Sequence, residues 1–300
     1  MSAPEWFVKR LGWKQATEKA SARCRRYFGV DRGPNLADLS GASSTRIAGE
    51  AYRILGIPID HEVDFDLGSV EAAKNKLART GSEDSEDAPP RRIPAAGTQL
   101  EQDLASDLEQ SLYRRTPGVD PASRPRRWLV TRQGDVSQFT QYEHLAALQE
   151  LLEDQPVLRS TVGRDYQVTT DVMIGAPSRW AGTKPYTLHA AVSSKLTIRS
   201  DRAQNIRVEF GTLVRNRRGR LPHLVVVTAE PLPSRVISIA RGTGEIDAIY
   251  HLMYHELGGA LEALEGEGRA LRDQAADWRE MIATGRVRPY EELADVLAAG

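Results

Sequence analysis

The most constraining feature of the chain is an uninterrupted apolar segment at residues 224–229 (LVVVTA). A strand without polar alternation is typical of a parallel sheet that is covered on both faces. Residues 188–198 (LHAAVSSKLTI) alternate instead, so Leu188, Ala190 and Val192 share one face and His189, Ser193 and Lys195 share the other. A third β-rich run occupies residues 166–175. The chain must therefore build a sheet whose central strand lies between two layers.

Helical patterns surround these strands. Leucines recur every four residues at positions 100, 104, 108 and 112, and residues 45–55, 141–152, 244–264 and 267–282 also have helical periodicity. Apolar and aromatic residues at near-helical spacing predict a first helix within residues 4–27. Strands separated by helical stretches indicate an α/β protein with a mixed central β-sheet flanked by helices.

The chain divides by composition into three parts. Residues 1–80 form an N-terminal helical region, residues 81–96 form an acidic flexible linker that contains EDSED, and residues 97–300 form the core with C-terminal helices. We expect one compact domain overall, because 300 residues suffice for a single sizeable core.

Composition excludes several classes of protein. The single cysteine, Cys24, excludes an internal disulfide framework and a cysteine-based zinc site. No apolar run is long enough to cross a bilayer, and residues 1–11 lack the pattern of a secretory signal, so we expect a cytoplasmic protein with no membrane partner. Residues 61–120 hold 13 acidic and 7 basic residues, whereas residues 191–220 hold 8 basic and 2 acidic residues. The basic stretch favours either a polyanion-binding surface or a solvated charged face.

Lys195 lies mid-strand beside Ser193, and Asp171 lies on the neighbouring predicted strand. A carboxylate and a lysine on adjacent strands can direct a divalent metal ion and an ammonium group to one phosphate, which suits phosphodiester hydrolysis. The alternative is an ordinary salt bridge at the sheet edge. A second acid is expected two residues before the lysine, where Ser193 stands; Glu209 is a replacement if residues 203–210 form a helix beside the sheet. Glu101 is a further carboxylate on a predicted helix.

Arg199, Ser200, Asp201 and Arg202 follow the strand directly. Arginine can donate two hydrogen bonds to guanine and aspartate can accept one from cytosine, so this tetrapeptide suits a G·C-rich major groove. Ser200 or Asp201 could cap a helix that begins here. Alone, the tetrapeptide equally fits a surface charge cluster.

Taken together, these motifs resemble one family. The segments 193–195 (SSK), 198–205 (IRSDRAQN) and Glu209 are similar to the NgoMIV-type, CCGG-recognising group of PD-(D/E)XK type II restriction endonucleases. That group has serine at the usual position of the second acid and recovers an acid from a later helix. The resemblance extends through 213–217, 219–223, 225–231, 233–235 and 242–247, and is recognisable from about residue 35 to residue 264.

The resemblance implies a Mg²⁺-dependent type II site-specific deoxyribonuclease that cleaves both DNA strands at a palindromic CCGG-containing site, 5′-GCCGGC-3′, with a 5′ overhang. It implies two Mg²⁺ ions per active site, held by Asp171, Glu101, Glu209 and the backbone carbonyl of Ser194. The implied catalytic residues are Glu101, Asp171, Ser193, Lys195 and Glu209.

For readout, the resemblance implies that Arg199, Asp201 and Arg202 contact the inner CCGG, that Arg235 and Asp38 read the outer pair, and that Ser40 contacts the minor groove; residues 1–80 thereby contribute to DNA binding. The implied partners are double-stranded DNA, other copies of the chain in a homotetramer built from two dimers, and a cognate methyltransferase. Residues 250–264 are a candidate oligomer helix, and the acidic linker is an alternative.

Two other classes remain open from the residues alone. One is a PD-(D/E)XK nuclease of the repair or junction-resolving type, which would bind by shape and would not need Arg199, Asp201 and Arg202 together. The other is a non-cleaving sequence-specific DNA-binding protein, for which Asp171, Lys195, Glu101 and Glu209 would be superfluous.

Overall fold

The computed structural model describes residues 2–8, 13–15, 32–34, 42–56, 96–116, 127–163, 166–179, 183–198, 200–242 and 244–300. Six strands form the main sheet in the order β3 (Leu129–Asp135), β4 (Thr169–Pro177), β5 (Tyr186–Lys195), β6 (His223–Thr228), β7 (Ala248–His251) and β8 (Val287–Pro289). The pairs β3–β4 and β4–β5 are antiparallel, and the pairs from β5 to β8 are parallel. The predicted mixed sheet is confirmed.

The apolar strand β6 lies between β5 and β7 in parallel pairing, and five of its six residues are buried. Both faces of β5 are also covered, since Ala191 and Ser193 are fully buried together with Ala190 and Val192. The small size of Ala191 and Ser193 allows a helix to approach this face closely. The buried strands therefore form a rigid centre on which the polar residues at the strand ends are placed.

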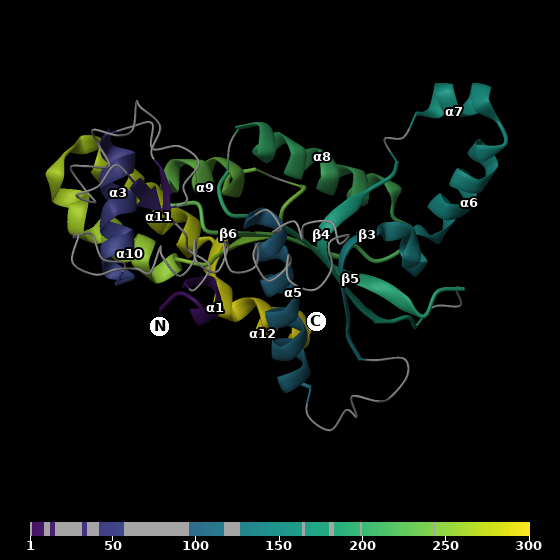
Figure 1. The fold of residues 1–300 in the computed structure, drawn as a ribbon, viewed down its shortest axis with the longest axis horizontal. Coiled ribbons are helices and arrows are strands. Elements are labelled where there is room, and N and C mark those ends of the chain that lie inside the picture. The colour runs from purple at the N-terminus through teal and green to yellow at the C-terminus, as the bar shows by residue number, and fades with distance from the viewer. Residues whose placement is uncertain are drawn as a thin grey trace, which may run out of the picture.

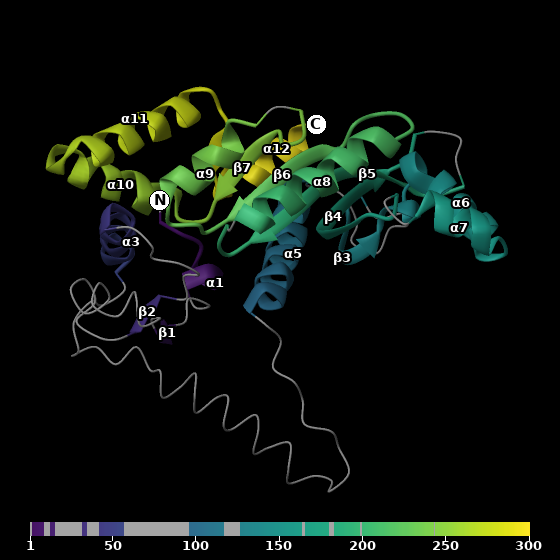
Figure 2. The same cartoon turned by 90° about the horizontal axis from the view of Figure 1, so that it is seen from above.

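Helices cover both faces of the sheet. Figures 1 and 2 show α8 (Ser200–Asn216) and α9 (Pro233–Ala240) on one side, and α5 (Ala96–Arg114) and α12 (Leu293–Ala299) on the other. The four leucines at positions 100, 104, 108 and 112 are buried, which confirms the periodicity of α5. On α8, Ile206, Phe210 and Leu213 are buried while Val208 is 64% exposed, so one stripe of this helix packs against the sheet.

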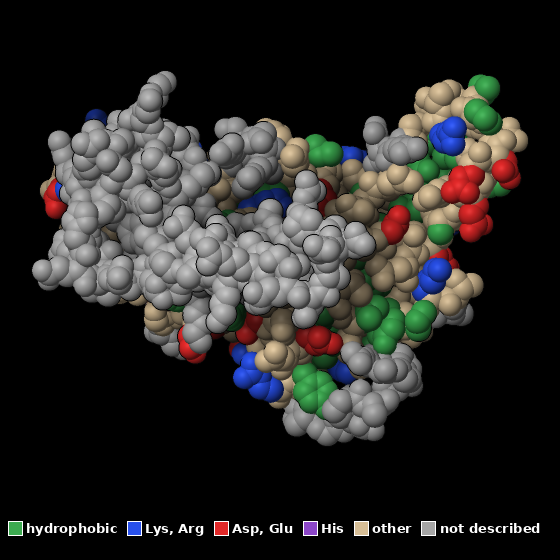
Figure 3. All heavy atoms as spheres, in the orientation of Figure 1, with side chains coloured by type: hydrophobic (Ala, Val, Ile, Leu, Met, Phe, Trp, Pro, Cys, Tyr) green, Lys and Arg blue, Asp and Glu red, His purple; other side chains and the backbone are tan. Residues whose placement is uncertain are grey.

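At one end of the sheet, α3 (Ala42–Ile54) packs against α10 (Tyr254–Leu264), which also contacts α11 (Arg269–Ala283). At the other end, α6 (Glu143–Glu153) and α7 (Pro156–Val162) project from the body (Figure 2). Apolar side chains are exposed on α6 and α7, at the upper right in Figure 3: Leu151, Val157, Leu158 and Val162. None of the described helices is both long and apolar enough to span a membrane.

Two sequence predictions about secondary structure were wrong. The predicted helix at residues 4–27 is contradicted at Trp13–Gln15, which form strand β1 and pair antiparallel with β2 (Arg32–Pro34). Of the other residues in this range that the structure describes, Glu5–Val8 form the short helix α1. The predicted helix at residues 244–264 contains strand β7 in its first part, because its residues Ala248–His251 are buried between β6 and β8. Residues 81–95 of the predicted linker lie outside the described residues.

The segment at residues 250–264, predicted as a candidate oligomer helix, packs inside the chain. Leu257, Ala260, Leu261 and Leu264 of α10 are buried within the chain itself, against α3 and α11. The apolar pattern that suggested an interface at residues 250–264 is thus explained by the internal core.

Candidate active site

The register of the antiparallel β4–β5 pair brings Asp171 and Lys195 together. Val172 pairs with Val192, so Asp171 near the start of β4 lies beside the last residues of β5. Asp171 Oδ2 accepts hydrogen bonds from the backbone N–H of Ser194 at 2.7 Å, from Ser193 Oγ at 3.4 Å and from the ammonium group of Lys195. The side chains of Lys195 and Asp171 are 21% and 19% exposed, so solvent reaches both without surrounding them.

Glu209 reaches this pair from α8. Burial and the charge of Asp171 raise the pKa of Glu209 to about 8, while Lys195 opposes the shift. Its Oε1 atom is buried and has no hydrogen-bond partner among the described residues. A buried carboxylate oxygen without a partner costs free energy unless a cation or a proton occupies it.

Glu101 reaches the same place from α5. Gln133 on β3 donates a hydrogen bond from its Nε2 to Glu101 Oε2 at 2.7 Å. Burial and the nearby charge of Asp171 raise the pKa of Glu101, whereas Gln133 and Lys195 lower it. The structure therefore places three sequence-predicted carboxylates and Lys195 within mutual electrostatic range, from two strands and from helices on both faces of the sheet.

The donor set fits a hard divalent cation. Three carboxylates and a backbone carbonyl are oxygen ligands of the kind that Mg²⁺ prefers, and Glu209 Oε1, which accepts no hydrogen bond from a described residue, could serve as one of them. As their side chains stand, no three described His, Cys, Asp or Glu residues converge closely enough to share one ion. Lys195 donates to Asp171 Oδ2, the same oxygen that accepts from Ser193 and Ser194.

Gln133 is a residue that the sequence analysis missed. The β3–β4 register pairs Arg132 with Val172 and Gly134 with Thr170, which puts Gln133 opposite Asp171. Its φ of 48° is positive, alone among the described non-glycine residues. Such a backbone conformation costs about 1–3 kcal/mol and persists where the surroundings enforce it. The glycine that follows it, inside a strand, is the sequence signal that could have revealed this irregularity.

The predicted readout residues are only partly described. Arg199, Asp38 and Ser40 lie outside the described residues, and Asp201 and Arg202 lie in the first turn of α8, with side chains outside the description. The predicted helix start is confirmed, because α8 begins at Ser200. Arg235 lies in the first turn of α9, which begins at Pro233, and its side chain is 24% exposed.

A second missed residue, Glu230, joins segments next to the predicted readout residues. It is 1% exposed and lies two residues after the end of β6. Its carboxylate accepts the N–H of Ile198 at 2.6 Å and the N–H of Leu232 at 3.1 Å, and it lies 3.7 Å from Arg235 Nη1. Glu230 thus ties the residue just before Arg199 to the start of α9. A charged residue at the end of an apolar strand was its visible sequence signal.

Thr228 extends this network to Lys195. Its Oγ1 donates to the backbone carbonyl of Lys195 at 2.7 Å and accepts the N–H of Glu230 at 3.1 Å. The strand end that carries the lysine and the loops that carry the predicted readout residues are therefore held by one buried polar network.

A mixed sheet flanked by helices, with an aspartate and a lysine on neighbouring strands and further carboxylates on the covering helices, is the α/β arrangement that the sequence resemblance predicted for a restriction endonuclease-like protein. The family described as NgoMIV restriction enzyme matches residues 90–181 and 172–296, more than half of the chain. The chain belongs to this family. The matched region contains Glu101, Asp171, Lys195, Glu209 and Arg235.

The Type II restriction enzyme NgoMIV of Neisseria gonorrhoeae is 40% identical over 192 residues, which cover 55% of this chain and 66% of that protein, slightly less than two thirds of its length. Among solved structures, the AgeI restriction endonuclease in complex with DNA overlaps 81% of each chain with 13% identity and a TM-score of 0.30. A TM-score of 0.30 does not establish a shared fold.

Proposed function

We propose that the protein is a type II restriction endonuclease that hydrolyses one phosphodiester bond in each strand of double-stranded DNA. The observation that carries the proposal is the Asp171–Lys195 pair at neighbouring ends of β4 and β5, together with the buried, unpartnered oxygen of Glu209 on α8. Family membership supports the same reaction class. An ordinary edge salt bridge would not require two further partly buried carboxylates, Glu209 and Glu101, beside it.

The proposed chemistry assigns one role to each residue. Asp171, Glu101, Glu209 and the carbonyl of Ser194 would hold two Mg²⁺ ions, which when bound polarise the phosphate and lower the pKa of bound water. The ammonium group of Lys195 orients the attacking water and stabilises charge on the phosphate oxygens. Ser193 donates to Asp171 and so fixes that carboxylate.

The proposed target is 5′-GCCGGC-3′, cut to leave a 5′ overhang. Arg199, Asp201 and Arg202 would read the inner bases, Arg235 and Asp38 the outer pair, and Ser40 the minor groove. The start of α8 directly after Arg199 supports this, since a helix that begins there presents the side chains of its first turn to a groove.

The proposed assembly is a homotetramer of two dimers. A palindromic site needs two subunits related by a two-fold axis, and the sequence resemblance implies that two such dimers associate. We further propose that a methyltransferase protects the same sequence in the host and that the enzyme acts in the cytoplasm, where that DNA lies.

The test is digestion of a plasmid of known sequence with Mg²⁺ or with EDTA, followed by sequencing of the fragment ends. Mg²⁺-dependent fragments that end at every GCCGGC are expected. Ends at a wider CCGG-containing set would keep the reaction and contradict the roles of Arg235 and Asp38. A smear would favour the shape-reading repair or junction nuclease, and DNA that is bound but uncut would favour the non-cleaving DNA-binding protein.

A further inference from the structure

A cavity of about 280 Å³ lies at the end of the sheet away from Asp171 and Lys195. Its walls come from the residues before β3, the residues after β4, the start of β5 and the turn before β6. The antiparallel β3–β4 and β4–β5 pairs and the parallel β5–β6 pair bring these four strand ends together. Leu188 and Lys195 lie near opposite ends of β5, so the cavity is roughly 20 Å from the candidate active site.

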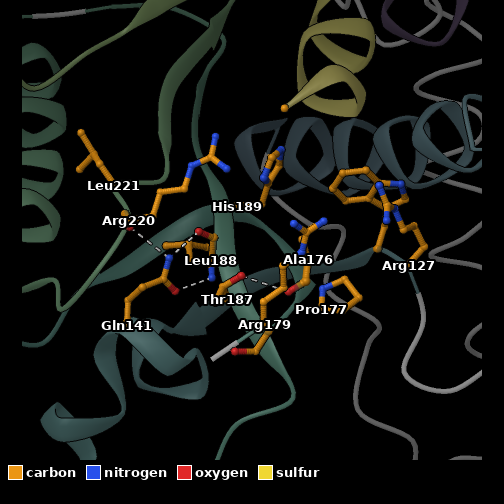
Figure 4. A pocket seen from close by; sticks show the side chains of 13 residues that line it. Arg127, Gln141, Ala176, Pro177, Arg179, Thr187, Leu188, His189, Arg220 and Leu221 are labelled. Atoms are coloured by element: carbon orange, nitrogen blue, oxygen red, sulfur yellow. Dashed lines mark hydrogen bonds between the residues drawn. The ribbon is translucent and has the colours of Figure 1, made fainter. Parts of the chain in front are cut away.

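Three arginines line this cavity: Arg127, Arg179 and Arg220. Figure 4 shows them around the ring of His189, each from a different strand end. None of the described lining residues is Asp or Glu, and none of the three guanidinium groups forms an ion pair with a described carboxylate. We name it the arginine cavity. Three gathered cations repel each other, and a bound anion would lower that repulsion.

The wall of the arginine cavity is fixed before any ligand binds. Gln141 is 2% exposed; its Nε2 donates to the carbonyls of Leu188 at 2.8 Å and Arg220 at 3.3 Å, and its Oε1 accepts the N–H of Leu188 at 2.7 Å. The backbone that carries Arg220 is therefore attached to β5 through a buried side chain. These bonds hold the arginine-bearing turn next to the strand, as in a formed binding site.

The aromatic side of the cavity is equally well packed. The His189 ring lies 5.2 Å from the ring of Trp128 and is held by the carbonyl of Leu297 at 2.9 Å. The Arg127 guanidinium lies over Trp128, 5.6 Å from the ring centroid. The indole N–H of Trp128, a residue that is only 7% exposed, has no partner among the described residues, so one more donor is unused here.

We propose that the arginine cavity binds a phosphate group, either of a DNA backbone or of a free phosphate compound. Planar guanidinium groups bind phosphate oxygens through paired hydrogen bonds, and several together match a tetrahedral dianion. One water molecule in the liquid occupies roughly 30 Å³, so the cavity has room for a phosphate and for part of what is attached to it. This site is additional to the proposed cleavage site and does not depend on it.

The first experiment measures the melting temperature of the protein with inorganic phosphate and with chloride at matched ionic strength. Wild-type protein and the control Arg218→Ala should be stabilised by phosphate, and the double variant Arg179→Ala/Arg220→Ala should not. Arg218 is a suitable control because it is exposed, close in sequence to Arg220, and lines a different hollow. Equal stabilisation by phosphate in all three proteins would overturn the proposal. It would also be overturned if phosphate did not stabilise the wild-type protein and the double variant kept the wild-type salt dependence of DNA binding.

The second experiment separates the two sources of phosphate. Binding of a duplex without CCGG is measured over a range of salt concentrations. If the cavity binds the DNA backbone, the slope of log K against log salt becomes shallower in the double variant, by about 1 for each arginine–phosphate pair that the substitutions remove. An unchanged slope together with the loss of stabilisation by inorganic phosphate assigns the site to a free phosphate compound. Cleavage of GCCGGC by the same proteins tests the proposed function separately.

Discussion

Lys195 is the residue on which the proposed chemistry depends. Lys195→Ala should lower the cleavage rate at GCCGGC by at least about 100-fold, because the charge on the phosphate oxygens loses its ammonium partner. Binding to the same duplex should be unchanged, as measured by mobility shift with Ca²⁺ in place of Mg²⁺. Lys184→Ala, at a loop far from Asp171, is the control and should cleave normally. Surviving cleavage in Lys195→Ala would show that the active site is elsewhere.

The raised pKa of Glu209 leads to a separate prediction about how stability depends on pH. Its pKa is about 8 in the folded protein against an ordinary 4.5, so the folded state keeps a proton that the unfolded state releases. Without metal, this residue should therefore lower the free energy of unfolding as pH rises from about 4.5 to about 8, by at most about 5 kcal/mol.

Glu209→Gln cannot titrate, so its melting temperature in EDTA should decline less over this pH interval than that of wild type. The wild-type minus variant difference isolates Glu209 from Glu101 and Glu230, whose pKa values are raised in the same direction. Parallel curves for the two proteins would contradict the burial of an unpartnered carboxylate.

At the scale of elements, Glu230 decides how the loop before α8 and the start of α9 sit together. Glu230→Gln places an amide donor where Ile198 or Leu232 needs an acceptor, which should lower the free energy of unfolding by about 1–3 kcal/mol. The ratio of cleavage at GCCGGC to cleavage at sites with one changed base should also fall, because Arg199 and Arg235 lose their common support.

Glu256→Gln is the matched control for Glu230. Glu256 is also buried, at 2% exposed, but it accepts hydrogen bonds from Ser2 and Ala3, far along the chain from the readout segments. It should lose stability and keep the cleavage ratio. If Glu230→Gln also kept the wild-type cleavage ratio, Glu230 would contribute to stability and not to sequence discrimination.

At the scale of the whole molecule, the proposed function requires more than one chain. Sedimentation velocity at micromolar concentration should show a tetramer, and a plasmid with two GCCGGC sites should be linearised without accumulating nicked circles. A monomer that only nicks its DNA would contradict the proposed assembly. Since the apolar residues Leu257, Ala260, Leu261 and Leu264 of α10 lie inside the chain, they are not available for contacts between subunits.

The sequence predicted those parts of the fold that depend on short-range pattern. Leucine spacing predicted α5, and the apolar run at 224–229 predicted a buried parallel strand; both are confirmed. The prediction failed at residues 248–251, whose sequence is compatible with a helix and becomes a strand between β6 and β8. The three-stranded antiparallel half of the sheet includes β3, which no pattern had indicated, because none of its seven residues is buried and its sequence lacks an apolar alternation.

The sequence alone determined which residue types could form a nuclease site: Asp171, Lys195, Glu101 and Glu209 were all identified before their positions were known. Only the tertiary structure decided that they meet, because the register of β4 and β5 and the packing of α5 and α8 are set by contacts between residues distant in the chain. It also placed Gln133 beside Glu101, buried Glu230 beside Ile198 and Leu232, and gathered the residues of the arginine cavity. Backbone strain, burial and unpaired charge are properties of surroundings, which no local pattern of residues contains.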